Sequence, residues 1–169
     1  YKKDLNEGKG SALILGYKKV SSSHIIVHDA DLEYEPTDIQ NLKELSIQNP
    51  KSLILGSRNL GNISRKKRYK YLVIGNKFIT KFFSLINNVS ISDISTCYMI
   101  YSKRFIENIV LNEKKFGIEI EILSKFVKTG NNIFEIPINY SGRSYKEGKK
   151  ITFKDGIGIF FKVFKYKFL

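Results

Sequence analysis

The chain has 169 residues, 42% of them hydrophobic and 13% aromatic, which is enough for one domain with a packed core and excludes a disordered protein. Its 29 Lys and Arg against 16 Asp and Glu give a formal charge of +13, so we expect a polyanionic partner such as nucleic acid, an anionic membrane surface or a phosphorylated substrate. The single cysteine, Cys97, excludes an internal disulfide and is interpreted as a buried thiol in a reducing compartment. Neither a signal-peptide pattern nor an apolar run of about 20 residues is visible, and we expect a cytoplasmic protein.

The first predicted element is a glycine turn that leads into a helix. Gly8, Lys9 and Gly10 precede residues 11–17, whose apolar spacing is typical of a helix packed on a sheet. The N-terminal end of a helix attracts anions, so this turn is a candidate phosphate site. It does not have the Gly and Ser/Thr spacing of a Walker A loop, and the residues alone favour a plain helix-start turn.

A short strand that ends in carboxylates comes next. Residues 25–28 form a β-branched run, and an acidic segment closed by Pro36 follows it. If the chain stays extended, side chains two residues apart point the same way, so Asp29, Asp31 and Glu33 converge on one small volume. Three such carboxylates favour a hard cation, Mg²⁺ or Mn²⁺. A solvated acidic turn is the alternative interpretation.

The next segments predict the fold class. A helix is expected from Pro36 or Thr37 to Ile47, and residues 52–55 form a second strand that stops at Gly56-Ser57-Arg58. The order of strand, acidic loop, helix and strand indicates a βαβ unit in a mostly parallel sheet, and therefore an α/β fold.

The rest of the chain continues this pattern without an internal repeat. A basic loop spans residues 61–70 and is interpreted either as a solvated face or as a surface that binds phosphate. The other predicted segments are a helix over residues 71–86, a polar loop and strand over 91–101, helices over 103–110 and 116–129, a strand over 133–140 bent or at an edge because of Pro137, a basic loop over 142–150, and a basic aromatic helix over 155–169.

Several short motifs now stand in a recognisable order. They are Asn6-Glu7-Gly8-Lys9-Gly10-Ser11-Ala12, Asp29-Ala30-Asp31-Leu32-Glu33-Tyr34, Gly56-Ser57-Arg58, Asp93-x-x-Thr96-Cys97-Tyr98, Phe116-Gly117-x-Glu119-x-Glu121, Ile136-Pro137-Ile138-x-Tyr140-x-x-Arg143, Glu147-Gly148-Lys149-Lys150-Ile151 and Lys154-Asp155-Gly156. In this order they resemble family 2 glycosyltransferases, in particular the dolichol-phosphate mannosyltransferase-like branch. The resemblance implies a GT-A fold, a Rossmann-like α/β sandwich with a nucleotide-binding half and an acceptor half.

For the donor side, the resemblance implies that the protein binds a nucleotide-sugar with Mg²⁺ or Mn²⁺. Gly8, Lys9 and Gly10 would border the nucleotide. Asp29 would lie near the ribose and the metal, and Asp31 together with Glu33 would coordinate the metal on the diphosphate, which makes Asp29, Asp31 and Glu33 the expected metal ligands. A diphosphate leaves readily only once its charge is neutralised, which agrees with the acidic cluster expected from the residues.

For the acceptor side, the resemblance implies a polyprenyl phosphate, such as dolichyl or undecaprenyl phosphate, and inversion at the anomeric carbon. Arg58, Arg68 and Arg143 would bind phosphates, and Asp93 would lie in the acceptor loop; Asp31, Asp93 and Arg143 are the expected catalytic residues. A phosphate monoester is largely dianionic at pH 7, since its second pKa is about 6, and it needs cations rather than a strong base.

The resemblance also shapes the expected organisation. We expect residues 1–169 to be one glycosyltransferase catalytic domain that lacks the first βα units of the family, because no Pro-x-Tyr-Asn-Glu-like strand precedes Tyr1. The helix over residues 155–169 is expected either on the cytoplasmic face of an anionic membrane or as a core helix. No nucleic-acid partner is expected in this interpretation.

Two other protein classes share parts of this pattern. A haloacid-dehalogenase-like phosphatase also places Asp-x-Asp after an apolar strand, but it requires a Gly-Thr or similar pair where this chain has Leu32-Glu33. A basic nucleic-acid-binding module agrees with the charge and the ten tyrosines, although RNA-recognition and zinc-finger patterns are missing.

Overall fold

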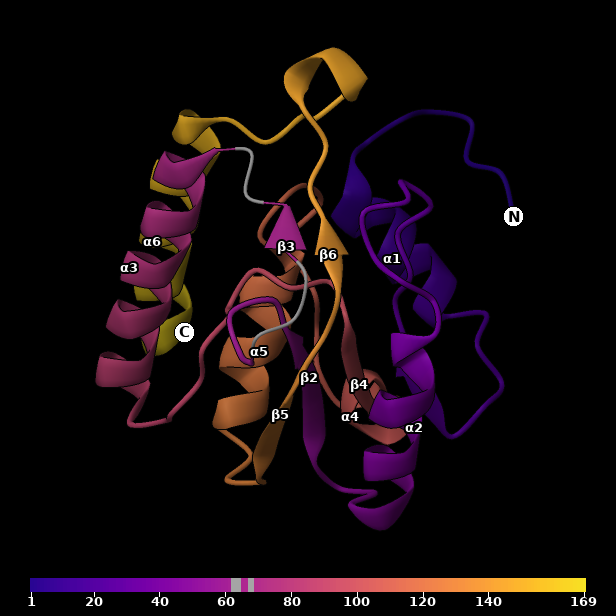
Figure 1. Ribbon diagram of the computed structural model, residues 1–169. Helices are drawn as coiled ribbons and strands as arrows, with labels where there is room; N and C mark the ends of the chain where they lie inside the picture. The colour runs from indigo at the N-terminus through magenta and orange to yellow at the C-terminus, as the bar shows by residue number, and fades with distance from the viewer. Residues whose placement is uncertain (62–64, 67–68) are drawn as a thin grey trace.

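The computed structural model describes residues 1–61, 65–66 and 69–169, and its centre is one mixed sheet (Figure 1). The strand order is β1 (His24–Ile26), β4 (Met99–Ser102), β2 (Leu53–Ser57) and β5 (Ile133–Pro137). β4 is antiparallel to β1 and to β2, whereas β5 is parallel to β2, so β1, β2 and β5 share one direction. The predicted α/β fold is therefore confirmed, with β4 as the reversed strand.

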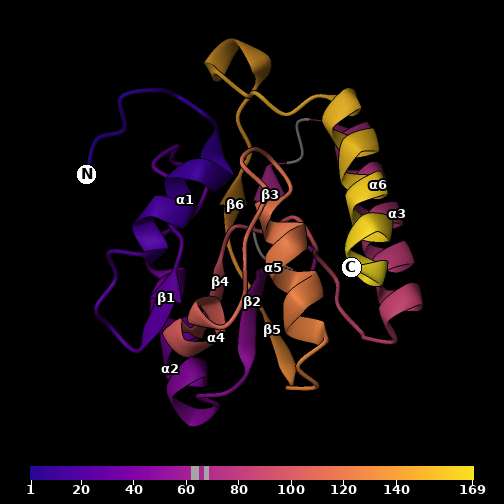
Figure 2. The same ribbon diagram turned by 180° about the vertical axis from the view of Figure 1, so that it is seen from behind.

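Helices cover both faces of this sheet, which explains why β2 is buried at every position. Leu53 and Leu55 belong to one apolar core, and Ile54 between them belongs to the other. Helix α2 (Asp38–Gln48) packs on the face seen in Figure 1. The opposite face, seen in Figure 2, carries α1 (Lys9–Tyr17), α4 (Lys103–Glu107) and α5 (Ile118–Val127).

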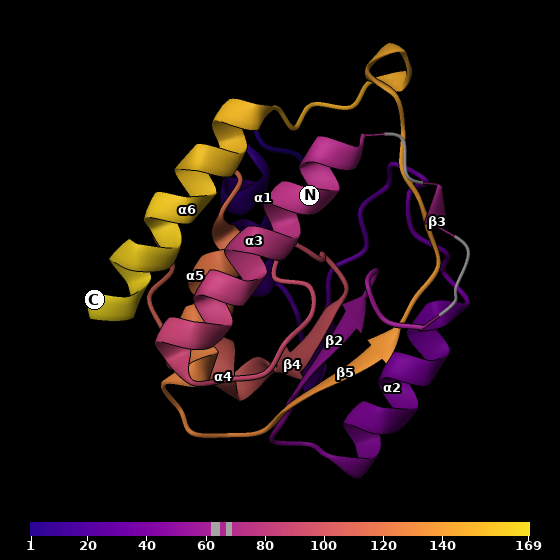
Figure 3. The same cartoon turned by 60° about the vertical axis from the view of Figure 1, so that its left-hand side comes forward.

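Two long helices form a separate layer beside the sheet. α3 (Lys70–Asn87) and α6 (Phe153–Phe168) lie side by side, and α6 also packs against α5 (Figure 3). The ring of Phe160 on α6 lies 6.2 Å from that of Phe78 and 4.7 Å from that of Phe82, both on α3. The amphipathic pattern of both segments thus buries one side of each helix in their mutual contact.

The C-terminal helix begins at Phe153, two residues before its predicted start at Asp155, and a capping box holds its first turn. The side chain of Asp155 accepts hydrogen bonds from the backbone N–H of Thr152, at 2.7 Å, and from its hydroxyl, at 2.8 Å, which satisfies donors of the first turn. Among the described residues, no helix combines the length and the apolar character needed to cross a bilayer.

Some predicted boundaries were wrong. The first strand stops at Ile26, two residues before its predicted end, and the helix predicted over 103–110 ends at Glu107. Pro137 ends β5 at the edge of the sheet, as expected for a residue without an N–H, and the chain then forms β6 (Tyr140–Ser141). β6 pairs with β3 (Arg65–Lys66), and a short 3-10 helix, η1 (Tyr145–Glu147), follows it.

Candidate functional site

A cleft of about 1130 Å³ opens where β1, β2 and β5 end. Ligands of open α/β sheets bind at the carboxyl ends of parallel strands, and the loops after these three strands all contribute to this cleft. Its second wall consists of α3 and α6, which supply apolar side chains such as Leu72, Phe78 and Phe160. The cleft is therefore charged on the sheet side and apolar on the side of the two helices.

The acidic segment after β1 turns instead of staying extended, so the predicted convergence of its carboxylates was wrong. A turn at Ala30 and Asp31 is followed by Leu32 at φ 58°, a left-handed conformation that is unusual for a residue other than glycine. This turn breaks the two-residue alternation. Among the described residues, no three His, Cys, Asp or Glu side chains are grouped closely enough to hold a metal ion together.

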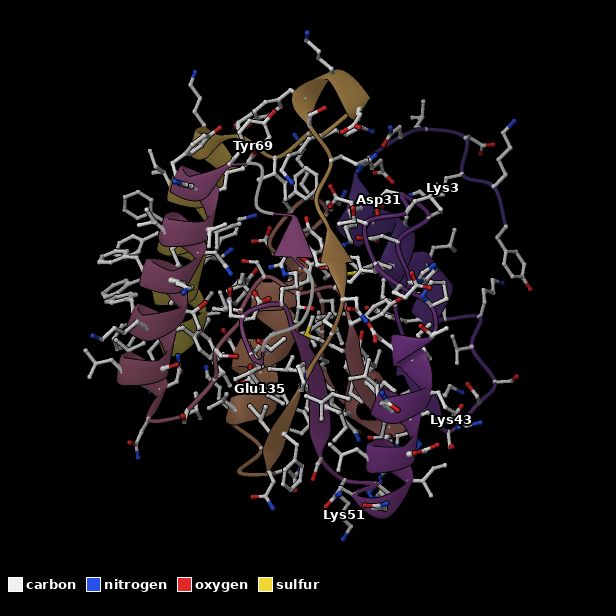
Figure 4. All side chains as sticks on the ribbon, viewed as in Figure 1. Lys3, Asp31, Lys43, Lys51, Tyr69 and Glu135 are labelled. Atoms are coloured by element: carbon white, nitrogen blue, oxygen red, sulfur yellow. The ribbon has the colours of Figure 1, made fainter. Side chains whose placement is uncertain are left out.

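The three carboxylates are instead paired with cations of the cleft, Asp29 with Lys9 and both Asp31 and Glu33 with Arg143. Asp29 accepts a hydrogen bond of 2.8 Å from Lys9, and Asp31 accepts one of 2.8 Å from the Arg143 guanidinium. Their side chains are 28% and 25% exposed, so both can reach a ligand in the cleft that they line. Asp31 lies at the same end of the molecule as Tyr69 (Figure 4).

Glu33 is more buried than its neighbours and is held by the strand that follows β5. Its two oxygens accept hydrogen bonds from the Tyr140 hydroxyl, at 2.7 Å, and from the Arg143 backbone, at 2.8 Å. Burial alone would raise the pKa of Glu33, but these hydrogen bonds and the nearby Lys149 lower it below its usual range. Glu33 thus fixes the start of the loop over residues 142–152, and with it the position of Arg143.

The glycine turn before α1 is a packing contact as well as part of the cleft. A Cβ on Gly10 would lie 2.0 Å from the carbonyl oxygen of Glu113, and one on Gly8, where φ is 105°, would lie 2.7 Å from that of Lys114. Gly8 and Lys9 line the cleft, whereas Gly10 is buried against this neighbouring loop. The close approach of two backbones explains the glycines without any ligand.

Arg58 and Asp93, predicted to act separately, form one ion pair. Asp93 is fully buried and accepts hydrogen bonds from Arg58 Nε (2.7 Å), Nη2 (2.8 Å) and backbone N (3.0 Å), and from the Asn76 amide at 2.8 Å. Burial would raise the pKa of Asp93, but the Arg58 guanidinium holds it below its usual range. The Arg58 guanidinium lies over the ring of Tyr140, 5.0 Å from its centroid, and lines the cleft.

Glu135 holds the loop that carries Asp93, and no sequence motif pointed to this residue. Its carboxylate accepts the backbone N–H of Ser92 at 2.9 and 2.8 Å and the Ser92 hydroxyl at 3.1 Å. Burial raises the pKa of Glu135. Glu119 was also assigned no role, although it belongs to a recognised motif; it lies 2.7 Å from Lys9.

The basic loop over residues 142–152 covers one end of the cleft and is tied to α3 by tyrosines. The ring of Tyr145 lies 4.7 Å from that of Tyr69, and its hydroxyl is 2.8 Å from the hydroxyl of Tyr71. Arg143, Lys149 and Lys150 of this loop line the cleft. Arg68, the third predicted phosphate ligand, lies outside the described residues.

Cys97 also lines the cleft but is not suited to nucleophilic chemistry. The residue is buried, as predicted, and burial raises the pKa of its thiol to about 12. A thiol that remains protonated at neutral pH is a poor nucleophile.

Comparisons with known proteins agree on one family. The family model described as "Glycosyl transferase family 2" matches residues 1–110. The chain is 30% identical over 149 residues to dolichol-phosphate mannosyltransferase of Pyrococcus furiosus, covering 86% of this chain and 42% of that protein. It is 26% identical over 177 residues to UDP-N-acetylglucosamine--dolichyl-phosphate N-acetylglucosaminyltransferase of Methanococcus voltae, covering 98% of this chain and 68% of that protein.

Solved structures show the same fold at lower identity. Glucosyl-3-phosphoglycerate synthase of Mycobacterium tuberculosis, in complex with phosphoglyceric acid, superposes with a TM-score of 0.67 at 13% identity, covering 96% of this chain and 56% of that one. The complex of that enzyme with Mn²⁺, UDP and glucosyl-3-phosphoglycerate gives a TM-score of 0.64 at 12% identity. The chain thus spans about half the length of the solved neighbours and 42% of the mannosyltransferase.

Proposed function

Because this chain belongs to glycosyl transferase family 2, we propose that it moves a sugar from a nucleotide-sugar donor to a polyprenyl phosphate. The names of the two archaeal relatives, which include dolichol phosphate and dolichyl phosphate, support this acceptor class. The observation that carries the proposal is the cleft, in which partly exposed carboxylates and basic side chains face an apolar wall. The family assignment does not favour the phosphatase alternative.

We propose that Asp29 and Asp31 hold Mg²⁺ or Mn²⁺. Both present carboxylate oxygens, the donors these ions prefer, to the same cleft, and both are partly exposed there. Bound at this position, the ion would neutralise the diphosphate leaving group. Glu33, the third predicted ligand, has both oxygens in hydrogen bonds to Tyr140 and Arg143, and we assign it to positioning that loop.

The cations of the cleft suit the phosphates of both substrates. Arg143 is 31% exposed and bonded to Asp31, so it is free to turn toward a phosphate when Asp31 binds a metal. Lys149 and Lys150 line the cleft nearby. An acceptor phosphate held by these groups on the side of the sugar opposite the diphosphate attacks with inversion and requires no strong base.

For Asp93 we propose a positioning role in place of the predicted catalytic one. Its carboxylate is fully buried and bonded to Arg58, so it acts on a ligand only through that guanidinium. Gly8 and Lys9 are proposed to border the donor nucleotide, since both line the cleft, whereas Gly10 supports the turn from behind.

We also propose that α6 and α3 rest together on an anionic membrane surface. Phe161, Phe164 and Phe168 of α6 are 66%, 55% and 73% exposed, and Phe78 of α3 is 64% exposed. Lysines lie among them, and each basic residue near an anionic leaflet contributes about 1 kcal/mol. Val163 and Tyr166 are buried, so α6 is at once a core helix and an exposed apolar surface.

Transfer of labelled sugar tests the reaction. The protein is incubated with nucleotide sugars, undecaprenyl phosphate and Mg²⁺ or Mn²⁺, and we expect labelled lipid to form. EDTA and the substitution Asp31→Ala should each abolish transfer, whereas Asp4→Ala, an exposed acid outside the cleft, should leave it unchanged. Activity that survives in EDTA or in Asp31→Ala would overturn the metal role.

Co-sedimentation with vesicles tests the membrane surface. Vesicles with about one third anionic lipid should bind the protein, and neutral vesicles should bind it weakly. Phe161→Ser combined with Phe164→Ser should lower binding, while Lys43→Glu on α2, on the far side of the molecule, should not. Equal binding of the double variant and the wild type would refute the assignment.

A further inference from the structure

Lys9 lies between two carboxylates that come from different parts of the chain. Its ammonium is 2.8 Å from Asp29, in the loop after β1, and 2.7 Å from Glu119, in the first turn of α5. All three side chains line the cleft and are partly buried, with exposures of 21% for Lys9 and 15% for Glu119. We infer that Glu119 is a positioning residue that retains Lys9 when Asp29 turns to a divalent cation.

Lys9, Asp29 and Glu119 together carry a net negative charge. One ammonium faces two carboxylates, which leaves one negative charge uncompensated in a partly desolvated position. Both carboxylates lie within hydrogen-bond distance of the Lys9 ammonium, so the ammonium is paired on two sides. The net negative charge of Lys9, Asp29 and Glu119 therefore favours the binding of a further cation.

Lys9 and Glu119 both belong to rigid parts of the fold. Lys9 and Glu119 stand at the beginnings of α1 and α5, and the start of α1 packs on the loop before α5, which Glu121 of α5 holds through the Glu113 N–H at 2.8 Å. The Ser11 N–H donates to the Lys114 carbonyl at 2.9 Å, and Gly10 packs on the carbonyl of Glu113. Asp29, in contrast, belongs to a loop. The Lys9–Glu119 contact is thus part of the scaffold, whereas the Lys9–Asp29 contact can open.

Lys9 and the divalent cation compete for the Asp29 carboxylate, a competition that rests on the proposed function. A metal that binds Asp29 must displace Lys9 from it. With Glu119 present, the displaced ammonium still has a carboxylate 2.7 Å away. Without Glu119 the same displacement would leave a partly buried ammonium without its scaffold partner, which is costly. Glu119 thereby lowers the cost of exchanging Lys9 for the metal.

Titration with Mn²⁺ alone, followed by the paramagnetic signal of free Mn²⁺, tests this exchange in the intact chain. Glu119→Gln should weaken Mn²⁺ binding about tenfold, and Glu119→Asp should restore most of it. Lys9→Met should tighten binding, because Asp29 then has no competing ammonium. Thermal unfolding of each variant checks that it is folded. Because Glu119→Gln should weaken Mn²⁺ binding and Lys9→Met should tighten it, a common loss of structure cannot explain both results.

A second pair of measurements separates the role of Glu119 from a general field effect. Glu7→Gln removes the same charge from the same cleft without touching Lys9, and it should change Mn²⁺ affinity less than Glu119→Gln. In the Lys9→Met background, Glu119→Gln should weaken Mn²⁺ binding clearly less than it does in the wild type, because only the field of the carboxylate is then lost. If it weakens Mn²⁺ equally in both backgrounds, Glu119 acts without Lys9 and the inference is overturned. Wild-type protein that binds no Mn²⁺ would overturn the proposed metal site as well.

Discussion

Two ion pairs of the cleft region use the same residue types in opposite ways. Asp93 is fully buried and Arg58 is 11% exposed, and two further groups, the Asn76 amide and the Arg58 backbone, bond to the same carboxylate. Asp31 and Arg143 are 25% and 31% exposed and share one hydrogen bond of 2.8 Å. The first pair is part of the architecture, whereas the second can exchange partners with a ligand. The degree of burial, more than the residue types, therefore decides whether such an ion pair stabilises the fold or can bind a ligand.

Removal of the buried carboxylate should have the largest effect on stability. Asp93→Ala takes away the charge that faces the Arg58 guanidinium, and losing one partner of a buried pair costs about 3–5 kcal/mol. Urea unfolding measures this loss directly. Asp31→Ala is the matched variant at the exposed pair, where the expected loss is about 1 kcal/mol or less. Similar losses in both variants would refute the distinction between the two pairs.

The exposed pair should instead dominate activity. Arg143→Ala removes a guanidinium proposed to hold phosphate, and we expect about a 100-fold drop in kcat/KM for sugar transfer, as for loss of one charge-stabilising donor. The free energy of unfolding should change by about 1 kcal/mol or less. Lys146→Ala, an exposed cation of the same loop outside the cleft lining, should leave both quantities unchanged. A large loss of stability in Arg143→Ala would make it a structural residue.

The sequence predicted the fold well where local pattern decides it. The apolar run of β2 and the amphipathic stripe of α3 were predicted from residue spacing, whereas the cap that begins α6 at Thr152 was not predicted. The reversed direction of β4 could not be predicted, because the pairing of a strand with distant neighbours depends on the whole sheet.

The sequence indicated several residues that line the candidate site, but it did not indicate how they are arranged. Asp29, Asp31 and Arg143 do line one cleft, but the turn at Leu32 separates the acids that an extended chain would have gathered. The pairing of Arg58 with Asp93, 35 residues apart, is a tertiary contact that spacing cannot reveal. Glu119 was visible in a motif, yet only its contact with Lys9 gives it a role.

Acid should weaken the architectural pair in a predictable window. Arg58 holds the folded-state pKa of Asp93 below its unfolded value of about 3.9, so the unfolded chain binds more protons near that pH. The stabilisation by Asp93 is therefore complete above the unfolded pKa and is lost as the pH falls through the folded pKa. In Asp93→Asn, the deficit in unfolding free energy should be largest near pH 7 and shrink below about pH 4. A deficit that does not vary with pH would mean that the carboxylate charge is not what Arg58 requires.

Substitution of Glu135 should have the smallest effect on stability. Glu135 is a partly buried carboxylate beside Asp93, but burial raises its pKa, whereas that of Asp93 is lowered. Its raised pKa means that the folded chain binds its proton more readily, so its ionisation costs stability as the pH rises through the ordinary value near 4.3. Glu135→Gln retains an acceptor for the Ser92 N–H and removes that charge, and we expect it to raise the unfolding free energy at pH 7 by less than about 1 kcal/mol. The gain should disappear near pH 4, where the wild-type carboxyl is itself protonated. A clear loss at pH 7 would show instead that the loop carrying Asp93 depends on the Glu135 charge, and the two neighbouring carboxylates would then have the same role.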